Sequence, residues 1–170
     1  MNRYTLIFTL LLSLVSFPSL GVDFNDLVKR DELYYKKFSN TPYSGKVTGE
    51  RQGSLERGKW DGEYLWYHEN GQLWKQGIYK NGKEEGEYFV YHDTGQLVSK
   101  GTYKNGVLEG LLLEYHDNGQ LFRKETYKNG KLEGEWVWYH ENGQLWKKVT
   151  YKNGKSEGKD IRYYDNGQLE

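Results

Sequence analysis

The chain repeats itself every 24 residues, and this period limits its possible folds more than any other feature. The string Tyr-Lys-Asn-Gly opens four units, and a second column of glycines, each followed by Gln-Leu, keeps the same spacing. A strict period indicates a repeat array, in which each unit is one supersecondary element stacked on its neighbours. The two columns are Tyr79, Tyr103, Tyr127 and Tyr151, and Gly71, Gly95, Gly119, Gly143 and Gly167.

Each repeat contains two short strands. Within residues 62–85, runs rich in aromatic and β-branched residues are bounded by Asn-Gly pairs, which is the signature of a β-hairpin. Asn-Gly favours a type I′ turn, because both central residues of that turn need a positive φ. The turns fall alternately 11 and 13 residues apart, which leaves no room for a helix. The sequence therefore predicts an all-β fold: an antiparallel β-hairpin repeat array forming an elongated, twisted meander, with about 4.8 Å added by each strand.

Side chains alternate across a strand, so each face of this sheet has its own columns of residues. One face combines an aliphatic column with a tyrosine column, and we expect it to be the buried face. Its members are Leu65, Phe89, Leu113, Val137 and Ile161, with Tyr67, Tyr91, Tyr115, Tyr139 and Tyr163.

The opposite face mixes large aromatic residues with charged ones, which suits a surface better than a core. Large aromatic side chains dominate protein interfaces, so this face is the predicted binding surface. The alternative is that the rings pair across strands and stiffen the sheet, at about 0.2–1 kcal/mol per pair. The candidate binding residues are Tyr64, Trp66, Trp74, Tyr88, Trp136, Trp138 and Trp146.

The N-terminal part departs from the period. Residues 1–21 combine Arg3, an apolar run over residues 6–17 and the small residues Ser19 and Gly21, which is typical of a signal peptide. We therefore expect export, to the periplasm or the medium. A membrane anchor is the alternative, although the run is short for a bilayer core of about 30 Å.

The remaining chain is divided into a cap and an array. Residues 22–54 are the expected cap, with a helical turn or two near residues 23–29 and a hairpin that pairs residues 33–38 with residues 43–47. Residues 55–170 hold five repeats, of which the last is incomplete. Atypical end units cover the edges of repeat arrays.

Charge and cysteine content exclude several classes of function. Arg3 is the only charged residue before residue 22, so the remaining chain has 23 basic and 24 acidic residues and a net charge of −1. That balance argues against nucleic-acid binding, which needs an excess of Lys and Arg. It also gives no attraction to anionic lipid, so membrane association is not expected. Without cysteine there is no disulfide framework.

Two further columns are candidates for chemistry, and neither predicts a reaction. The histidines His68, His92, His116 and His140 should be about 9.6 Å apart, too far to share a metal ion. A carboxylate column has identical environments at every step, whereas a catalytic pair needs two different ones. We expect these carboxylates to pair with turn lysines, and we predict no enzyme activity, metal or cofactor. The column is Asp61, Glu85, Glu109, Glu133 and Glu157.

The repeat unit resembles a known family. The string Tyr-Lys-Asn-Gly-Lys-x-Glu-Gly, followed by an aromatic strand and Tyr-His-x-Asn-Gly-Gln-Leu, is similar to the bacterial variant of the MORN repeat, found in YwqK-type antitoxin-like proteins. The resemblance covers residues 55–170. The second glycine of standard MORN units is replaced here by Tyr64, Tyr88, Leu112, Trp136 and Asp160. This departure weakens the transfer of lipid binding from eukaryotic MORN proteins.

The resemblance implies a non-enzymatic scaffold for protein–protein interaction, with antitoxin-like neutralisation of a partner protein, such as a toxin, as a specific form. A module that binds cell-envelope glycan through its aromatic columns is the alternative. Binding to a membrane surface, by analogy with other MORN proteins, is the third.

Overall fold

The computed structural model describes residues 20–170, and it is built almost entirely of β-strands. The expected signal peptide, residues 1–21, lies almost wholly outside the described residues. The N-terminal strands are β1 (Val22–Asp23), β2 (Leu27–Arg30), β3 (Leu33–Lys36), β4 (Gly45–Thr48), β5 (Arg51–Glu56) and β6 (Lys59–Trp60). The strands of the repeats are β7 (Gly62–Tyr67), β8 (Leu73–Lys80), β9 (Lys83–Tyr91), β10 (Leu97–Lys104), β11 (Val107–Leu108), β12 (Gly110–Tyr115), β13 (Leu121–Lys128), β14 (Lys131–Leu132), β15 (Gly134–Tyr139), β16 (Leu145–Lys152) and β17 (Lys155–Arg162).

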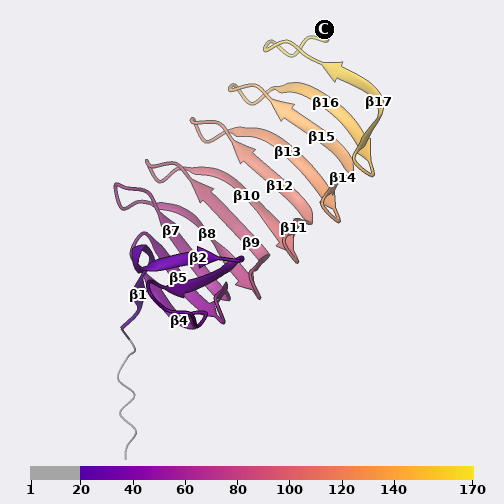
Figure 1. The fold of residues 1–170 in the computed structure, drawn as a ribbon. Helices are drawn as coiled ribbons and strands as arrows, with labels where there is room; N and C mark the ends of the chain where they lie inside the picture. Colours follow the sequence, from indigo (N-terminus) through magenta and orange to yellow (C-terminus); the bar gives the residue numbers. More distant parts are fainter. Residues whose placement is uncertain (1–19) are drawn as a thin grey trace, which may run out of the picture.

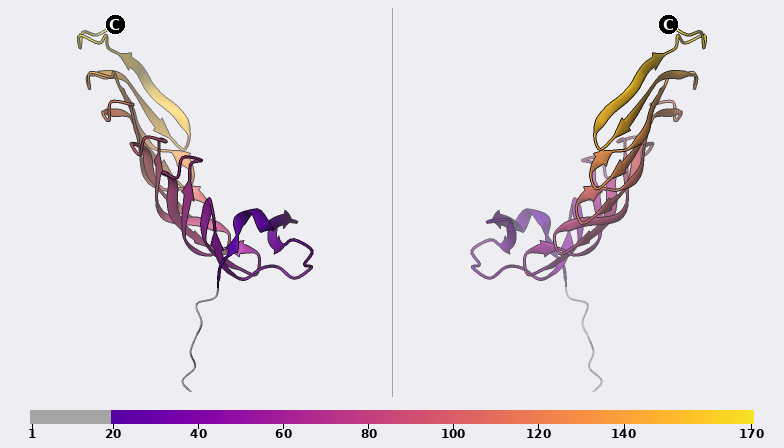
Figure 2. Two further views of the ribbon diagram at one scale, coloured as in Figure 1. Left: turned by 90° about the vertical axis from the view of Figure 1, so that its left-hand side faces the viewer. Right: turned by 90° about the vertical axis from the view of Figure 1, so that its right-hand side faces the viewer.

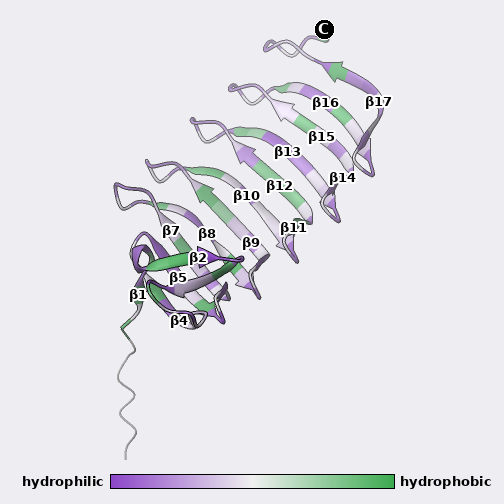
Figure 3. Cartoon of the chain, in the orientation of Figure 1, coloured by the Kyte–Doolittle hydropathy of each residue, from purple (hydrophilic) through white to green (hydrophobic). Residues whose placement is uncertain are grey.

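The strands form one long open sheet, as the period predicts. Its order is β1-β4-β5-β7-β8-β9-β10-β12-β13-β15-β16-β17, and every pair from β4 onward is antiparallel. Successive hairpins climb side by side into an elongated, twisted ribbon (Figure 1). Hydrophobic and hydrophilic residues are interleaved along its strands (Figure 3). Across residues 20–170, no helix combines the length and apolar character needed to cross a membrane.

The Asn-Gly turns are of two kinds. Asn81 and Gly82 both have positive φ, 51° and 79°, which is the type I′ turn that the sequence predicts, and three later repeats agree. At the other end of the hairpin only Gly71 has positive φ, and its N–H donates to the carbonyl of His68 over 2.9 Å. This turn is a type I turn with a bulge, so the type I′ prediction is wrong there. Loop length explains the difference: the His68 N–H donates to the Gln72 carbonyl over 2.8 Å, which leaves a three-residue loop, and such loops favour a type I turn with a bulge. The Asn70 side chain supports the turn by accepting the Gln72 N–H at 3.0 Å.

The predicted burial of the two faces is also wrong, except at Val137, which is buried as expected. Leu65, expected inside, is 36% exposed, whereas Tyr64 is 1% exposed and Tyr88 is 8% exposed. The sheet has no second layer over most of its length, so burial depends on how side chains cover one another. Broad aromatic rings lie over neighbouring strands and bury each other, while most of the opposite column is only half-buried between polar side chains.

The N-terminal cap packs on the face that carries Tyr64. Leu27, Val47, Leu55 and Trp60 form its core, with Tyr79 from the first repeat packed against them. The cap projects from one side of the sheet at its N-terminal end (Figure 2). We call the face on which it packs the cap-side face, and the other the open face.

The local prediction for the cap is partly wrong. Residues 24–26 form a single 3-10 turn, and residues 27–30 extend into β2 rather than a helix. The strand β3 pairs with β2 along its length, and β4 pairs with β5. Of the predicted hairpin only an isolated Tyr35–Pro42 bridge and the bond from the Tyr43 N–H to the Tyr34 carbonyl, at 2.9 Å, are formed. Asp31 and Glu32 make the tight turn between β2 and β3 with φ of 47° and 64°, without the glycine that identifies such turns in sequence.

Candidate binding faces of the sheet

The aromatic rings of the cap-side face pack on one another. The Tyr64 and Tyr79 ring centroids are 4.8 Å apart, and those of Trp136 and Trp138 are 4.0 Å apart. These distances suit direct aromatic contact. Burial raises the pKa of the Tyr64 phenol above its ordinary value, and it raises the pKa of Tyr79 to about 12.

The structure spreads the seven predicted binding residues over a wide range of exposure. Tyr64, Tyr88 and Trp138 are buried, so their first role is packing within the sheet. Trp66 and Trp136 are half-buried. Only Trp74 and Trp146 are well exposed, at 38% and 39%. The aromatic pairing alternative therefore describes most of the set, and a binding role for these residues stays a prediction.

Charged side chains on the cap-side face are neutralised by neighbours on the same face. Lys75 Nζ lies 2.9 Å from Glu84 Oε1, and the Tyr64 hydroxyl donates to the same oxygen over 3.0 Å. Lys147 Nζ lies 3.0 Å from Asp160 Oδ2. A surface that pairs its own charges offers little electrostatic attraction to a ligand.

The most buried charge belongs to the third repeat. Glu125 is 1% exposed and accepts a hydrogen bond from the Tyr127 hydroxyl over 2.6 Å. Arg123 Nε lies 3.0 Å from Glu125 Oε1 without hydrogen-bonding alignment, so this contact is an ion pair. Arg123 also donates to Glu114 Oε1 over 2.7 Å. One guanidinium therefore serves two carboxylates.

The histidine column links consecutive repeats. The Nε2 atoms of His68, His116 and His140 lie 2.9, 2.9 and 3.0 Å from the backbone carbonyl oxygens of Tyr91, Tyr139 and Tyr163. His92 is the exception, since its Nε2 lies 3.2 Å from Asp117 Oδ1. Within residues 20–170, no group of histidine and carboxylate side chains is arranged to hold a metal ion.

The carboxylate column also joins repeats, but not through the lysines that we expected. Four of the five carboxylates, all but Glu157, accept the backbone N–H of the asparagine in the next type I′ turn, as Glu85 does from Asn105 at 2.7 Å and Glu109 from Asn129 at 2.6 Å. The ionised acceptor strengthens such a bond. The column therefore stabilises the array, and the lysine-pairing prediction is wrong.

The open face carries a continuous row of side chains across the strands. Gln76 pairs with Leu65 and Phe89, and Lys100 pairs with Phe89 and Leu113. Lys124 continues the row between Leu113 and Val137, and Lys148 continues it between Val137 and Ile161. Apolar and polar residues thus alternate along the row. Sequence reasoning identified the aliphatic column but placed it inside, so it missed this surface.

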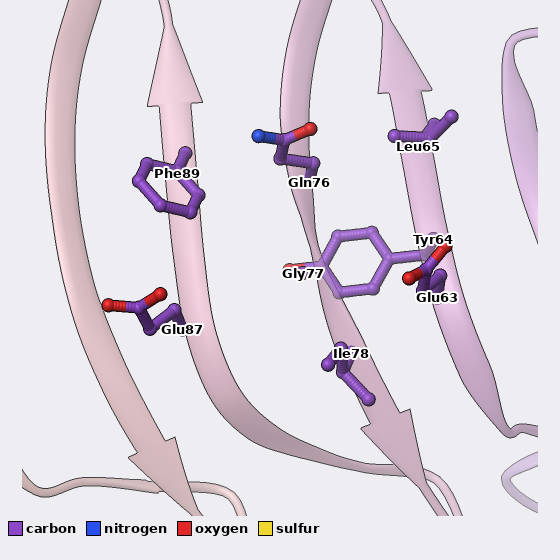
Figure 4. A pocket seen from close by; sticks show the side chains of 8 residues that line it. All are labelled: Glu63, Tyr64, Leu65, Gln76, Gly77, Ile78, Glu87 and Phe89. Atoms are coloured by element: carbon purple, nitrogen blue, oxygen red, sulfur yellow. The ribbon is translucent and has the colours of Figure 1, made fainter.

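Two grooves, each of about 330 Å³, lie next to this row. In the first, Leu65, Gln76 and Phe89 lie at one level of three neighbouring strands, and Glu63, Ile78 and Glu87 lie at the next (Figure 4). The second groove lies between Phe89 and the pair Leu111 and Leu113, with Lys100 at its wall. The two share Glu87 and Phe89, so together they form one shallow channel across the repeats.

These observations define a class of protein: a repeat scaffold with a single β-sheet layer, whose two faces are surfaces available for contact. A family model described as MORN repeat variant matches residues 60–81, 84–105, 108–129 and 132–153. The matched segments cover just over half of the chain, and the chain belongs to the MORN repeat variant family. MORN repeats generally mediate protein or membrane interactions. No curated protein matches the chain.

Proposed function

We propose that this chain is an exported, non-enzymatic scaffold that binds another protein through the open face of its sheet. The observation that carries the proposal is the apolar exposure of that face, where Leu65, Ile78 and Leu111 are 36%, 44% and 43% exposed. Contiguous exposed apolar surface is typical of interaction sites. The cap-side face is less suitable, because its rings and charges are already paired.

The open face is large enough for such an interface. Eight neighbouring strands from β7 to β16, spaced about 4.8 Å apart, extend the face for roughly 30 Å. Strands of six to nine residues give it a width of roughly 20 Å. A standard interface covers about 800 Å² of each partner, which a surface of this size and its margins can supply.

Site-specific photocrosslinking in the native host tests this proposal. A photoreactive residue replaces Leu111 on the open face in one variant and Thr41 in the exposed cap loop in another. We expect a defined protein adduct from position 111 only. The adduct partner is then purified, and its affinity for the chain is measured by calorimetry.

Matched substitutions complete the experiment. Leu111→Glu should weaken the purified complex at least tenfold, whereas Val107→Glu should leave it unchanged. Val107 is 45% exposed, much like Leu111, but it lies in the turn strand β11, outside both grooves. Equal adducts from the two crosslinking positions, or equal losses in the two variants, would contradict binding through the open face.

Antitoxin-like neutralisation is the specific form of this function that the repeat resemblance supports. The crosslinked partner, expressed alone in the exported compartment, should then arrest growth, and the wild-type chain should relieve the arrest. The Leu111→Glu variant should not relieve it. A partner that is harmless when expressed alone would rule out neutralisation while leaving protein binding intact.

Export itself is tested by sequencing the N-terminus of the mature protein recovered from the cell envelope or the medium. Cleavage after Gly21 supports the proposal. Intact Met1 on the protein at its final location would contradict the signal peptide.

Glycan binding is a second candidate, favoured by the exposure of Trp74 and Trp146. Each lies beside a histidine at a hairpin end, with ring centroids 6.0 Å apart for His68 and Trp74 and 5.9 Å apart for His140 and Trp146. Co-sedimentation with peptidoglycan tests this candidate. Loss of sedimentation in Trp74→Ala and Trp146→Ala, but not in Leu111→Glu, would favour glycan over protein.

A further inference from the structure

The third repeat breaks the pattern of the open face. The position two residues before the central apolar residue is Glu63, Glu87 and Glu135 in the first, second and fourth repeats and Lys159 in the fifth, but it is Leu111 here. In the fourth repeat the acidic residue neutralises a lysine on the neighbouring strand, since Glu135 forms an ion pair with Lys148. Leu111 replaces that anion with exposed apolar surface.

The change removes the carboxylate that would face Lys124, because Lys124 stands to Leu111 as Lys148 stands to Glu135 in the fourth repeat. Within residues 20–170, neither Lys100 nor Lys124 takes part in an ion pair, and both flank Leu113 in the cross-strand row. Lys124 is exposed and Lys100 is half-buried. The one carboxylate lining this groove is Glu87, which stands to Lys100 as Glu135 stands to Lys148 but makes no ion pair with it. Phe89, Lys100, Leu111, Leu113 and Lys124, which we call the Leu111 patch, thus combine apolar surface with net positive charge.

The spacing of the grooves limits the shape of a ligand. The two grooves lie at equivalent positions one repeat apart, and two strands separate equivalent points by about 9.6 Å. A polyproline-II segment advances about 9.3 Å in three residues, so every third side chain meets the next groove. A β-strand places same-face side chains about 6.7 Å apart, and an α-helix repeats a face after about 10.5 Å. The polyproline-II period is the closest of the three to the spacing of the two grooves.

We propose that the Leu111 patch and the adjoining groove bind an extended polyproline-II segment of a partner protein, with an apolar residue at every third position and acidic residues beside Lys100 and Lys124. The adjoining groove, which Glu63 and Glu87 line, takes apolar side chains only. The apolar side chains enter the grooves on either side of Phe89, and the carboxylates reach Lys100 and Lys124. This inference rests on the proposed protein-binding function and specifies the chemistry of the partner. Polyproline-II segments suit such grooves because they are already extended before binding.

A synthetic peptide tests the inference directly. The probe repeats Leu-Pro-Glu over about four units, which spans roughly 37 Å. The first control has the same composition with the order scrambled so that leucines do not fall on every third residue. The second replaces every glutamate with lysine. Fluorescence anisotropy with labelled peptide measures binding to the protein at low and high salt.

We expect the probe to bind at least tenfold more tightly than either control and to weaken as salt increases. Lys124→Glu should weaken binding at least fivefold, whereas Lys128→Glu should not. Lys128 is an exposed lysine at the end of the same strand, beyond the groove, and circular dichroism of both variants checks the fold. Leu111→Glu, which restores the pattern of the other repeats, should also abolish the preference for the probe.

The inference is overturned if the scrambled peptide binds as well as the probe, or if Lys124→Glu and Lys128→Glu have equal effects. It is also overturned if the probe does not bind. None of these outcomes contradicts the proposed function if a protein partner still crosslinks at position 111 and loses affinity in the Leu111→Glu variant. Conversely, a probe that binds this patch while no partner crosslinks to the face would contradict the proposed function alone.

Discussion

The Tyr64 ring lies against the backbone of Gly77, so closely that a Cβ added at Gly77 would be 2.8 Å from the Tyr64 hydroxyl oxygen. The two residues are directly paired on β7 and β8. The same position pairs Tyr88 with Gly101 in the second repeat, Leu112 with Glu125 in the third and Trp136 with Val149 in the fourth. A tyrosine at this position faces glycine, and other residues face a larger partner.

This relationship predicts that Gly77→Ala destabilises the protein by about 1–3 kcal/mol, because the added methyl group overpacks the site. Tyr64→Leu destabilises it separately by removing buried ring surface. The double variant, Tyr64→Leu with Gly77→Ala, places leucine opposite a residue with a side chain, as the third repeat does. Its free energy of unfolding should be about 0.5–3 kcal/mol higher than the sum of the two single losses predicts. Denaturant unfolding of all four proteins measures the coupling. Strictly additive losses would show that the ring and the glycine do not constrain one another.

The buried carboxylate of the third repeat gives a second prediction. Arg123→Met removes the cation beside Glu125, which is 1% exposed, and should destabilise the protein by about 3–5 kcal/mol. Methionine keeps much of the side-chain volume of arginine, so the loss of stability reflects the missing charge more than lost packing. Arg30→Met serves as the control, because that arginine belongs to the cap and its partners are exposed. Equal stability losses in the two variants would contradict a special role for the Arg123 ion pair.

The two kinds of Asn-Gly turn lead to a third prediction. Asn118 donates to the Glu141 carbonyl over 2.8 Å and accepts from the Gln120 N–H at 2.9 Å. Asn118→Gly should therefore cost about 1–3 kcal/mol, the sum of two hydrogen bonds. Asn129 has φ of 51° and is needed for its backbone conformation, so Asn129→Gly should change stability by less than about 0.5 kcal/mol. Thermal unfolding of the two variants compares them directly, and similar melting temperatures would be the contrary result.

The same turns predict a stabilising change. Thr94 stands where the other repeats have the linking asparagine. Thr94→Asn should restore the bond to the next repeat and raise the free energy of unfolding by about 0.5–1.5 kcal/mol. The contact between His92 Nε2 and Asp117 Oδ1, which joins this repeat to the next at 3.2 Å, should be unchanged in the variant. Thr94→Ser is the control, because serine cannot reach the next repeat. If the Thr94→Asn variant is no more stable than Thr94→Ser, the asparagine bond between repeats does not stabilise the array.

The sequence predicted the architecture well because turns and period are local properties. Asn-Gly pairs at fixed spacing are enough to define hairpins and their order. Burial was not predictable in the same way, since it depends on how far rings such as Tyr64 extend over a neighbouring strand and on which face the cap covers. The pairing of Tyr64 with Gly77 was visible in principle, because ring and partner sizes vary together across the repeats. The cap turn at Asp31 and Glu32 had no glycine to reveal it.

The packed tyrosines predict how stability responds to alkaline pH. Burial, and next the charge of Glu84, raises the pKa of Tyr79 from 10.0 to about 12. The folded state therefore holds this proton over a range in which the unfolded chain loses it. The resulting stabilisation is fully present below pH about 10 and is lost as the pH rises to about 12 and above. Because the ring is only partly buried, we expect its share to be about 1 kcal/mol.

Tyr79→Phe removes the ionisable group while keeping the ring, so its free energy of unfolding should fall less steeply than that of the wild type between pH about 10 and 12. Urea unfolding across this range gives both curves, and the ionisation of lysines affects the two proteins alike. Tyr164→Phe, at a tyrosine that is 52% exposed, removes a phenol outside the packed face and serves as the control. If the Tyr79→Phe and wild-type curves run parallel while both proteins stay folded at pH about 9, burial of the Tyr79 phenol does not contribute to stability.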